Sequence, residues 1–123
     1  MSILLIWLSG LSLLLCVPTS AWPHAQLVKS VPASRAGLSK ALAQVQLWFN
    51  ERLEARFCHL AVWNAAGQQV DSGDVQVDPT NSKKLSVGLP ALASGLYTVK
   101  YRVLSVDGHI VEDQFPFTVR GSP

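Results

Sequence analysis

The sequence predicts an all-β protein: a single small Greek-key β-sandwich or barrel of immunoglobulin-like or cupredoxin-like type. Short segments of alternating apolar and polar residues run through residues 44–119, and turn-forming residues separate them. No stretch has the three-to-four-residue apolar spacing of a convincing amphipathic helix. We therefore expect roughly seven short strands in one domain.

Residues 44–49 show the two-residue period of a strand with one buried face. The same period appears at residues 59–63. A turn sequence, Asn-Ala-Ala-Gly at 64–67, follows and predicts that residues 68–72 return as a hairpin partner. The first half of the domain is thus expected to contain at least one β-hairpin.

The second half begins with a dense cluster of turn formers at residues 78–82, followed by an alternating run at 84–89. Residues 97–103 form the clearest strand, with Tyr and Val on one side and Thr, Lys and Arg on the other. The last alternating segment is 114–119. Proline has no N–H to donate to a neighbouring strand, so Pro116 indicates an edge or a bulge there.

The N-terminus is typical of a secretory signal. Residues 3–17 are almost continuously apolar and are followed by Pro-Thr-Ser-Ala, a run too short for a standard membrane span. We interpret residues 1–23 as a signal peptide and 24–123 as the mature domain, with an uncleaved membrane anchor as the alternative. Cleavage after Ala21 would leave Trp22 first, whereas cleavage after Pro23 would expose His24.

Composition narrows the function classes. The formal net charge is +2, from ten Lys and Arg against eight Asp and Glu. These charges are spread along the chain without a basic run, which excludes the basic cluster of a nucleic-acid-binding surface. Removal of residues 1–23 leaves about 100 residues, enough for one domain. We expect a soluble mature domain that is a monomer.

Two cysteines are present, and Cys16 lies within the predicted signal peptide. Cys58 would then be alone in the mature domain, so no internal disulfide is expected. It alternates with Leu60 and Val62, which favours a small buried core residue. A thiolate metal ligand and an intermolecular disulfide are the alternatives.

The three histidines are His24, His59 and His109. A chain beginning at His24 would offer an α-amino group and an imidazole from one residue, which is a ready metal chelate. Asp107 and His109 are two residues apart, so on an extended segment both side chains would project from one face. Asp107 and Gly108 together are also a strong turn signal, so a simple turn between two strands is the alternative.

The motifs above, taken together, resemble the CopC/PcoC/YobA family of periplasmic copper-binding proteins. The resemblance covers residues 24–119, and it is most specific at its two ends. The residues that carry it are His24-Ala25-Gln26-Leu27, Val31-Pro32-Ala33, Leu47-Trp48-Phe49-Asn50-Glu51, Ala93-Ser94-Gly95-Leu96-Tyr97, Ser105-Val106-Asp107-Gly108-His109 and Phe115-Pro116-Phe117-Thr118-Val119.

The resemblance implies a Cu(II) site made by the amino nitrogen and imidazole of His24 together with Asp107 and His109. Glu51 matches a glutamate linked to the same site in some members. A solvated residue in a strand-ending turn is the alternative for Glu51. Two imidazoles, an amine and a carboxylate form the nitrogen-rich tetragonal set that Cu(II) prefers, with zinc as the main competitor.

Two departures from the family pattern are informative. Some members have a methionine-rich loop for Cu(I), but the only methionine here is Met1, which excludes a Cu(I) thioether site. Cys58 and His59 stand where the family has small residues. Strand alternation sends their side chains to opposite faces, so we expect His59 to be a surface histidine and no second metal site.

The leading hypothesis is a non-enzymatic periplasmic Cu(II) carrier or buffer in copper resistance or uptake, which hands copper to an inner-membrane copper transport protein. One alternative is a copper-dependent oxidoreductase with an N-terminal histidine brace. Such enzymes need an extended aromatic substrate surface, for which Trp48 and Trp63 are the only candidates outside the region of signal-peptide processing. The other alternative is a metal-free immunoglobulin-like interaction module.

Overall fold

The computed structural model describes residues 26–121. The predicted signal peptide and the candidate ligand His24 lie outside the described residues. Within the described range, no helix has the length and apolar character needed to cross a membrane.

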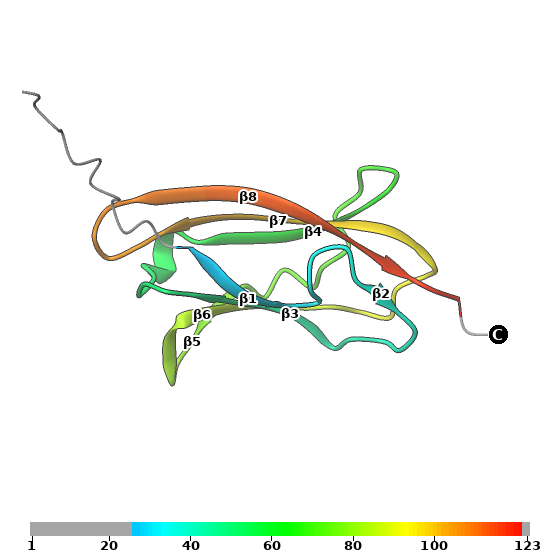
Figure 1. The fold of residues 1–123 in the computed structure, drawn as a ribbon, viewed down its shortest axis with the longest axis horizontal. Helices are drawn as coiled ribbons and strands as arrows, with labels where there is room; N and C mark the ends of the chain where they lie inside the picture. Colours follow the sequence, from blue (N-terminus) through cyan, green and yellow to red (C-terminus); the bar gives the residue numbers. More distant parts are fainter. Residues whose placement is uncertain (1–25, 122–123) are drawn as a thin grey trace, which may run out of the picture.

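The described chain forms two four-stranded sheets packed face to face, as Figure 1 shows. The first sheet has the order β1 (Leu27–Val31), β3 (Gln44–Phe49), β6 (Asn81–Gly88), β5 (Gln76–Asp78). The second has the order β2 (Gly37–Leu38), β8 (Ile110–Val119), β7 (Gly95–Leu104), β4 (His59–Asn64). All pairings are antiparallel except that of β2 with β8. The prediction of a small all-β sandwich is confirmed.

The core is formed by the inward residues of the alternating strands. In β3 every second residue is buried, and β7 repeats the pattern along most of its length. Aromatic rings join the two sheets: Phe49 and Tyr101 meet edge to face with centroids 5.6 Å apart. The residues exposed by less than 2% are Val45, Leu47, Val62, Leu85, Val87, Val99, Val103, Ser105 and Phe117.

The predicted hairpin after β4 is shorter than expected. Of residues 68–72, only Gln69 forms a bridge to β4, opposite Trp63. The ladder stops because a side chain replaces the next backbone partner: Asp71 Oδ2 accepts the Val62 N–H at 2.9 Å. The segment then crosses to the other sheet and reaches β5.

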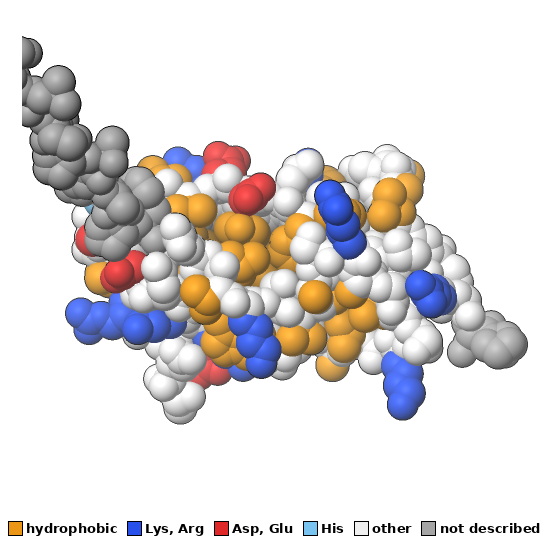
Figure 2. Space-filling view, viewed as in Figure 1, with side chains coloured by type: hydrophobic (Ala, Val, Ile, Leu, Met, Phe, Trp, Pro, Cys, Tyr) orange, Lys and Arg blue, Asp and Glu red, His pale blue; other side chains and the backbone are white. Residues whose placement is uncertain are grey.

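The predicted edge character at Pro116 is confirmed. Pro116 lies opposite Thr98 of β7, and its carbonyl accepts the Arg35 N–H at 2.7 Å on the side away from β7. The nitrogen and carbonyl of one strand residue point the same way, so the missing N–H costs the β7–β8 ladder no hydrogen bond. In the view of Figure 2, apolar side chains reach the surface along the seam between the sheets, and charged side chains are scattered around them.

Several loops gather at one end of the sandwich. The start of β1, the 3-10 turn η1 (Ala55–Phe57) and the β7–β8 connection all lie at the left in Figure 1. Backbone hydrogen bonds join two of these segments, because Glu54 N–H donates to the Leu104 carbonyl at 2.8 Å and Val106 N–H to the Arg52 carbonyl at 2.9 Å. This end of the sandwich holds the candidate site.

Candidate metal site

The segment Ser105–His109 is the turn that joins β7 to β8. The Gly108 N–H donates to the Ser105 carbonyl at 2.9 Å, and the Ser105 N–H donates to the His109 carbonyl at 3.0 Å. Gly108 has φ +90°, a left-handed conformation that glycine adopts at little cost. The turn interpretation of Asp107-Gly108 is therefore confirmed, and the extended-segment interpretation is wrong.

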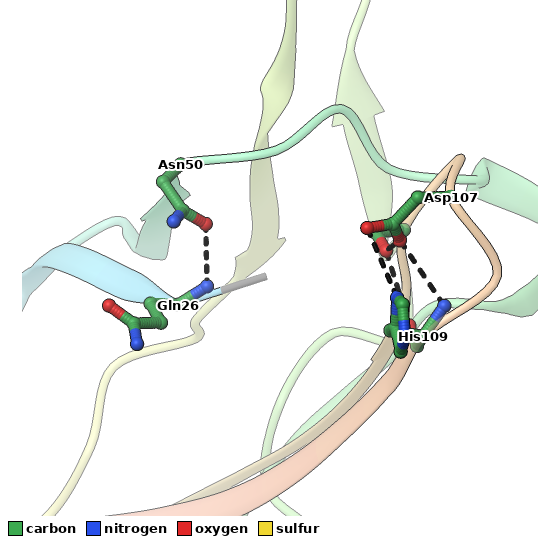
Figure 3. A network of polar contacts seen from close by, with 5 residues as sticks. Gln26, Asn50, Asp107 and His109 are labelled. Carbon is green, nitrogen blue, oxygen red and sulfur yellow. Dashed lines mark hydrogen bonds and ion pairs between the residues drawn. The ribbon is translucent and has the colours of Figure 1, made fainter. Parts of the chain in front are cut away.

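The turn nevertheless brings the two predicted ligands together. His109 Nδ1 lies 3.1 Å from Asp107 Oδ2, and each side chain is about one-third exposed. The other carboxylate oxygen of Asp107 accepts the His109 backbone N–H at 3.2 Å and also the hydroxyl of Ser105. Figure 3 shows Asp107 and His109 facing one another across this turn.

These contacts keep the carboxylate ionised. The Ser105 hydroxyl above all, with the side chain and backbone N–H of His109 adding to it, holds the pKa of Asp107 below its ordinary value. Hydrogen bonds to the charged form are the physical cause. A metal ion would therefore find Asp107 deprotonated at neutral pH, as a ligand must be.

The separation of the two side chains suits adjacent donors of one ion. Two ligand atoms at about 2.0 Å from a metal and at right angles, as in a tetragonal site, lie about 2.8 Å apart. The observed distance of 3.1 Å from Nδ1 to Oδ2 is close to this value. Residues 26–121 contain no group of three or more His, Cys, Asp or Glu arranged for a metal, and the predicted ligand His24 lies outside that range.

The start of β1, the first described segment of the chain, lies at the same end of the sandwich as this turn. The Gln26 N–H donates to Asn50 Oδ1 at 2.6 Å, and the Asn50 N–H donates to the Gln26 carbonyl at 3.1 Å. Figure 3 places this pair in the same view as Asp107 and His109. His24, two residues before Gln26, is not described, so its position relative to the pair stays a prediction.

Glu51 follows Asn50 at the end of β3 and is half-buried in a bend of the chain. The backbone immediately after it runs beside the β7–β8 turn, because Leu53 bridges Ser105. Glu51 does not join Asp107 and His109 in a group of three potential ligands in the described part of the chain. Its proposed role in the site stays a prediction.

Two residues at this end were missed in the sequence. Ser105 is 1% exposed and donates to Asp107, and Asn50 anchors the start of β1. The sequence offers a weak signal for Ser105, because Ser, Asp and Gly in close succession favour side-chain hydrogen bonds within a turn. It offers none for Asn50, whose partner is 24 residues away.

The remaining candidate residues are Cys58, His59 and Trp48. Cys58 is buried at 8% exposure, as predicted, and its thiol donates to the Glu54 carbonyl at 3.2 Å. His59 is exposed, also as predicted. Trp48 does not offer a free aromatic surface, because the ammonium groups of Lys29 and Lys84 lie 4.7 and 5.0 Å from its ring centroid.

Comparison with known proteins shows which family the chain belongs to. The family model of the CopC domain matches residues 27–120. The copper transport protein CutJ of Bacillus subtilis is 32% identical over 114 residues, covering 92% of this chain but only 21% of CutJ. The chain thus spans about a fifth of the length of that relative. Protein YobA of Escherichia coli is 30% identical over 105 residues, which are 85% of each chain.

Solved structures agree with the fold. CopC from Methylosinus trichosporium OB3b superposes with a TM-score of 0.69 and 32% identity, over 78% of this chain and 93% of that one. PcoC, a methionine-rich copper resistance protein from Escherichia coli, gives 0.66 and 26%, over 79% and 99%. The fold and its relatives thus define a small β-sandwich of the copper resistance and copper transport class. The chain belongs to the CopC family.

Proposed function

We propose that this protein binds one Cu(II) ion and acts as a non-enzymatic copper carrier or buffer in copper resistance or uptake. The observation that carries the proposal is the pairing of His109 Nδ1 with Asp107 Oδ2 at 3.1 Å, at the end of the sandwich where the described chain begins. His24, two residues before that beginning, would complete the donor set with its amino group and imidazole.

This donor set matches the chemistry of Cu(II). Three nitrogen donors and one carboxylate suit a tetragonal ion, and copper stands at the top of the divalent affinity order. The chain's single methionine, Met1, cannot make the soft multi-thioether site that Cu(I) requires. We therefore assign Cu(II) as the cargo and propose no Cu(I) methionine site.

The proposed location is the periplasm. Residues 1–23 have the composition of a signal peptide, and export would place the domain where metal ions reach it before they cross the inner membrane. There the mature domain would be a soluble monomer that hands copper to an inner-membrane copper transport protein. The name of the relative CutJ, a copper transport protein, supports this kind of partner.

The non-enzymatic assignment rests on the surroundings of the site. An oxidoreductase acting on a polymer needs a flat aromatic surface beside its metal. Trp48 carries two lysine ammonium groups over its ring, and Lys100 lies 5.6 Å from the centroid of Trp63. Neither ring lies in the turn that holds Asp107 and His109.

The deciding experiment compares chain starts. Cu(II) affinity is measured by competition with a chelator of known affinity for the protein starting at His24 and for the form starting at Trp22. In the second form the α-amine belongs to Trp22, and Pro23 has no amide N–H to lose to copper. We expect one equivalent of Cu(II) to bind the His24 form far more tightly. Equal affinities would overturn the proposed ligand set.

The mass of the exported protein shows which start exists in the cell. A mass that matches a chain starting at His24 agrees with the proposal. A mass that matches a chain starting at Trp22 contradicts the four-donor site, because the amino group and the His24 imidazole would then belong to different residues.

A further inference from the structure

We propose that an apolar rim beside the candidate site is the docking surface for the copper-accepting protein, a membrane copper transport protein. The rim is defined as Phe57, Val106 and Ile110. This inference rests on the proposed function, because it names where the partner binds when it receives the ion held by Asp107 and His109.

Exposed apolar side chains concentrate at the site end of the sandwich. Five large apolar residues are clearly exposed in the described part of the chain. Phe57, Ile110 and Val106, at 54%, 54% and 45% exposure, belong to the segments around the Ser105–His109 turn. Leu96 is at the start of β7, the opposite end, and Val28 is in β1. Concentrated exposed apolar surface marks interaction sites.

Backbone hydrogen bonds hold together the segments that carry the three rim residues. Ile110 is paired with Leu104 across the β7–β8 ladder. The η1 turn that carries Phe57 is attached to the same residue, because Glu54 N–H donates to the Leu104 carbonyl at 2.8 Å. Val106 is the second residue of the turn that also contains Asp107. A partner covering the rim would therefore contact the turn that holds the proposed ligands.

The surface beside Ile110 is better suited to binding a polypeptide than a lipid. A groove of about 710 Å³ lies there, lined by Gln26 and Leu27 on one side and by Tyr101 and residues 110–113 on the other. In the described chain, β2 pairs with β8 only at Thr118 and Val119. Among residues 26–121, no strand pairs with the outer edge of β8 near Glu112. Its backbone groups need hydrogen bonds, which a polypeptide supplies and hydrocarbon does not.

Charged side chains lie close to Phe57 in the chain. Arg52 and Arg56 are exposed in the connection that contains η1, together with Glu54. An apolar centre with arginine and other charges at its border is the ordinary composition of such interfaces. The arginines favour a partner that presents carboxylates around an apolar patch.

A relative indicates what kind of protein the partner is. The region of CutJ that matches this chain is 21% of that copper transport protein. In CutJ the CopC-like part is therefore joined to a much larger remainder in one chain. A copper transport protein is thus the partner class that the comparisons favour for this domain.

Photocrosslinking in the cells that make the protein tests the docking surface. Phe57, Ile110 and Leu96 are each replaced by photoreactive benzoylphenylalanine in the full chain, and adducts are identified by mass spectrometry. Leu96 is the matched control, at 52% exposure on the far end. We expect adducts with a membrane copper transport protein from positions 57 and 110 and none from position 96.

Every other result overturns the docking proposal: no adduct from either rim position, equal adducts from Leu96, or adducts only with lipid or with a second copy of this chain. A second measurement follows the rate of copper transfer from this protein to the partner that crosslinking identifies. The double variant Phe57→Ser, Ile110→Ser should transfer copper about tenfold more slowly, with unchanged Cu(II) affinity and melting temperature. Unchanged transfer by this variant contradicts docking at the rim.

The same variants separate this inference from the proposed function. If the unaltered protein does not bind Cu(II), the proposed function fails, whatever the crosslinks show. If Cu(II) binding is tight but the rim positions give no partner, the carrier proposal stands and the docking surface fails.

Discussion

Gln26 and Asn50 form a reciprocal hydrogen-bonded pair. The Gln26 N–H donates to Asn50 Oδ1 at 2.6 Å, and the Gln26 carbonyl accepts the Asn50 N–H at 3.1 Å. The pair joins the start of β1 to the end of β3. It lies at the same end of the sandwich as Asp107 and His109.

We expect Asn50→Ala to weaken Cu(II) binding, because the amino-terminal donor would lose its anchor. The free energy of unfolding should fall by about 1 kcal/mol, the usual value of one hydrogen bond. Asn81→Ala is the matched control, since Asn81 Oδ1 also accepts one backbone N–H, from Lys83 at 3.1 Å. Chelator competition and chemical denaturation measure both effects. Equal losses of affinity in the two variants would contradict an anchoring role.

His109→Ala should lower Cu(II) affinity by more than about a hundredfold. Removing a residue that only orients a ligand already costs about 10–100-fold, and His109 is proposed as a ligand itself. His59→Ala is the control, because His59 is exposed on β4 and outside the proposed site. Titration with Cu(II) at fixed pH measures the difference. A His109→Ala affinity within a few-fold of the His59→Ala value would contradict the assignment.

Ser105→Ala should raise the pKa of Asp107 toward its ordinary value, because the Ser105 hydroxyl is the largest cause of the lowered pKa. A lowered folded-state pKa contributes stability above the unfolded pKa, and this contribution is lost as pH falls through the folded value. The variant should therefore lose this stability at a higher pH than the wild type. NMR titration of the Asp107 carboxyl carbon measures the pKa, and an unchanged pKa would contradict the inferred contact.

Cys58 should react slowly with a thiol reagent such as DTNB in the folded protein and rapidly after unfolding. Burial raises the pKa of its thiol, and the carboxylate of Glu54 adds to the shift. Because the pKa of the Cys58 thiol is raised in the folded state, the thiol contributes to folding stability below its unfolded-state pKa. This contribution is lost as pH rises through the folded-state pKa. Equal rates for folded and unfolded protein would show that the thiol is accessible.

Strand patterns in the sequence were sufficient for the central strands. Alternation predicted β3 and β7, because each has one face in the core and a period of two follows directly. Alternation did not reveal β1, since its register shifts between Leu27 and Lys29 and the shift interrupts the period. The predicted strand at 68–72 was reduced to a bridge because Asp71 takes the N–H of Val62.

By itself, the amino-acid sequence determined the sandwich class, because the alternation of apolar and polar residues is a local pattern. It left both a turn and an extended segment open at Asp107-Gly108, and the candidate donors came from the resemblance to a copper-binding family. Only the tertiary structure decided that the Ser105 hydroxyl holds Asp107 ionised and that Asn50 anchors the start of β1 beside that turn. Pairing of distant strands creates these contacts. No local pattern encodes which loops a pair of packed sheets will bring to the same end.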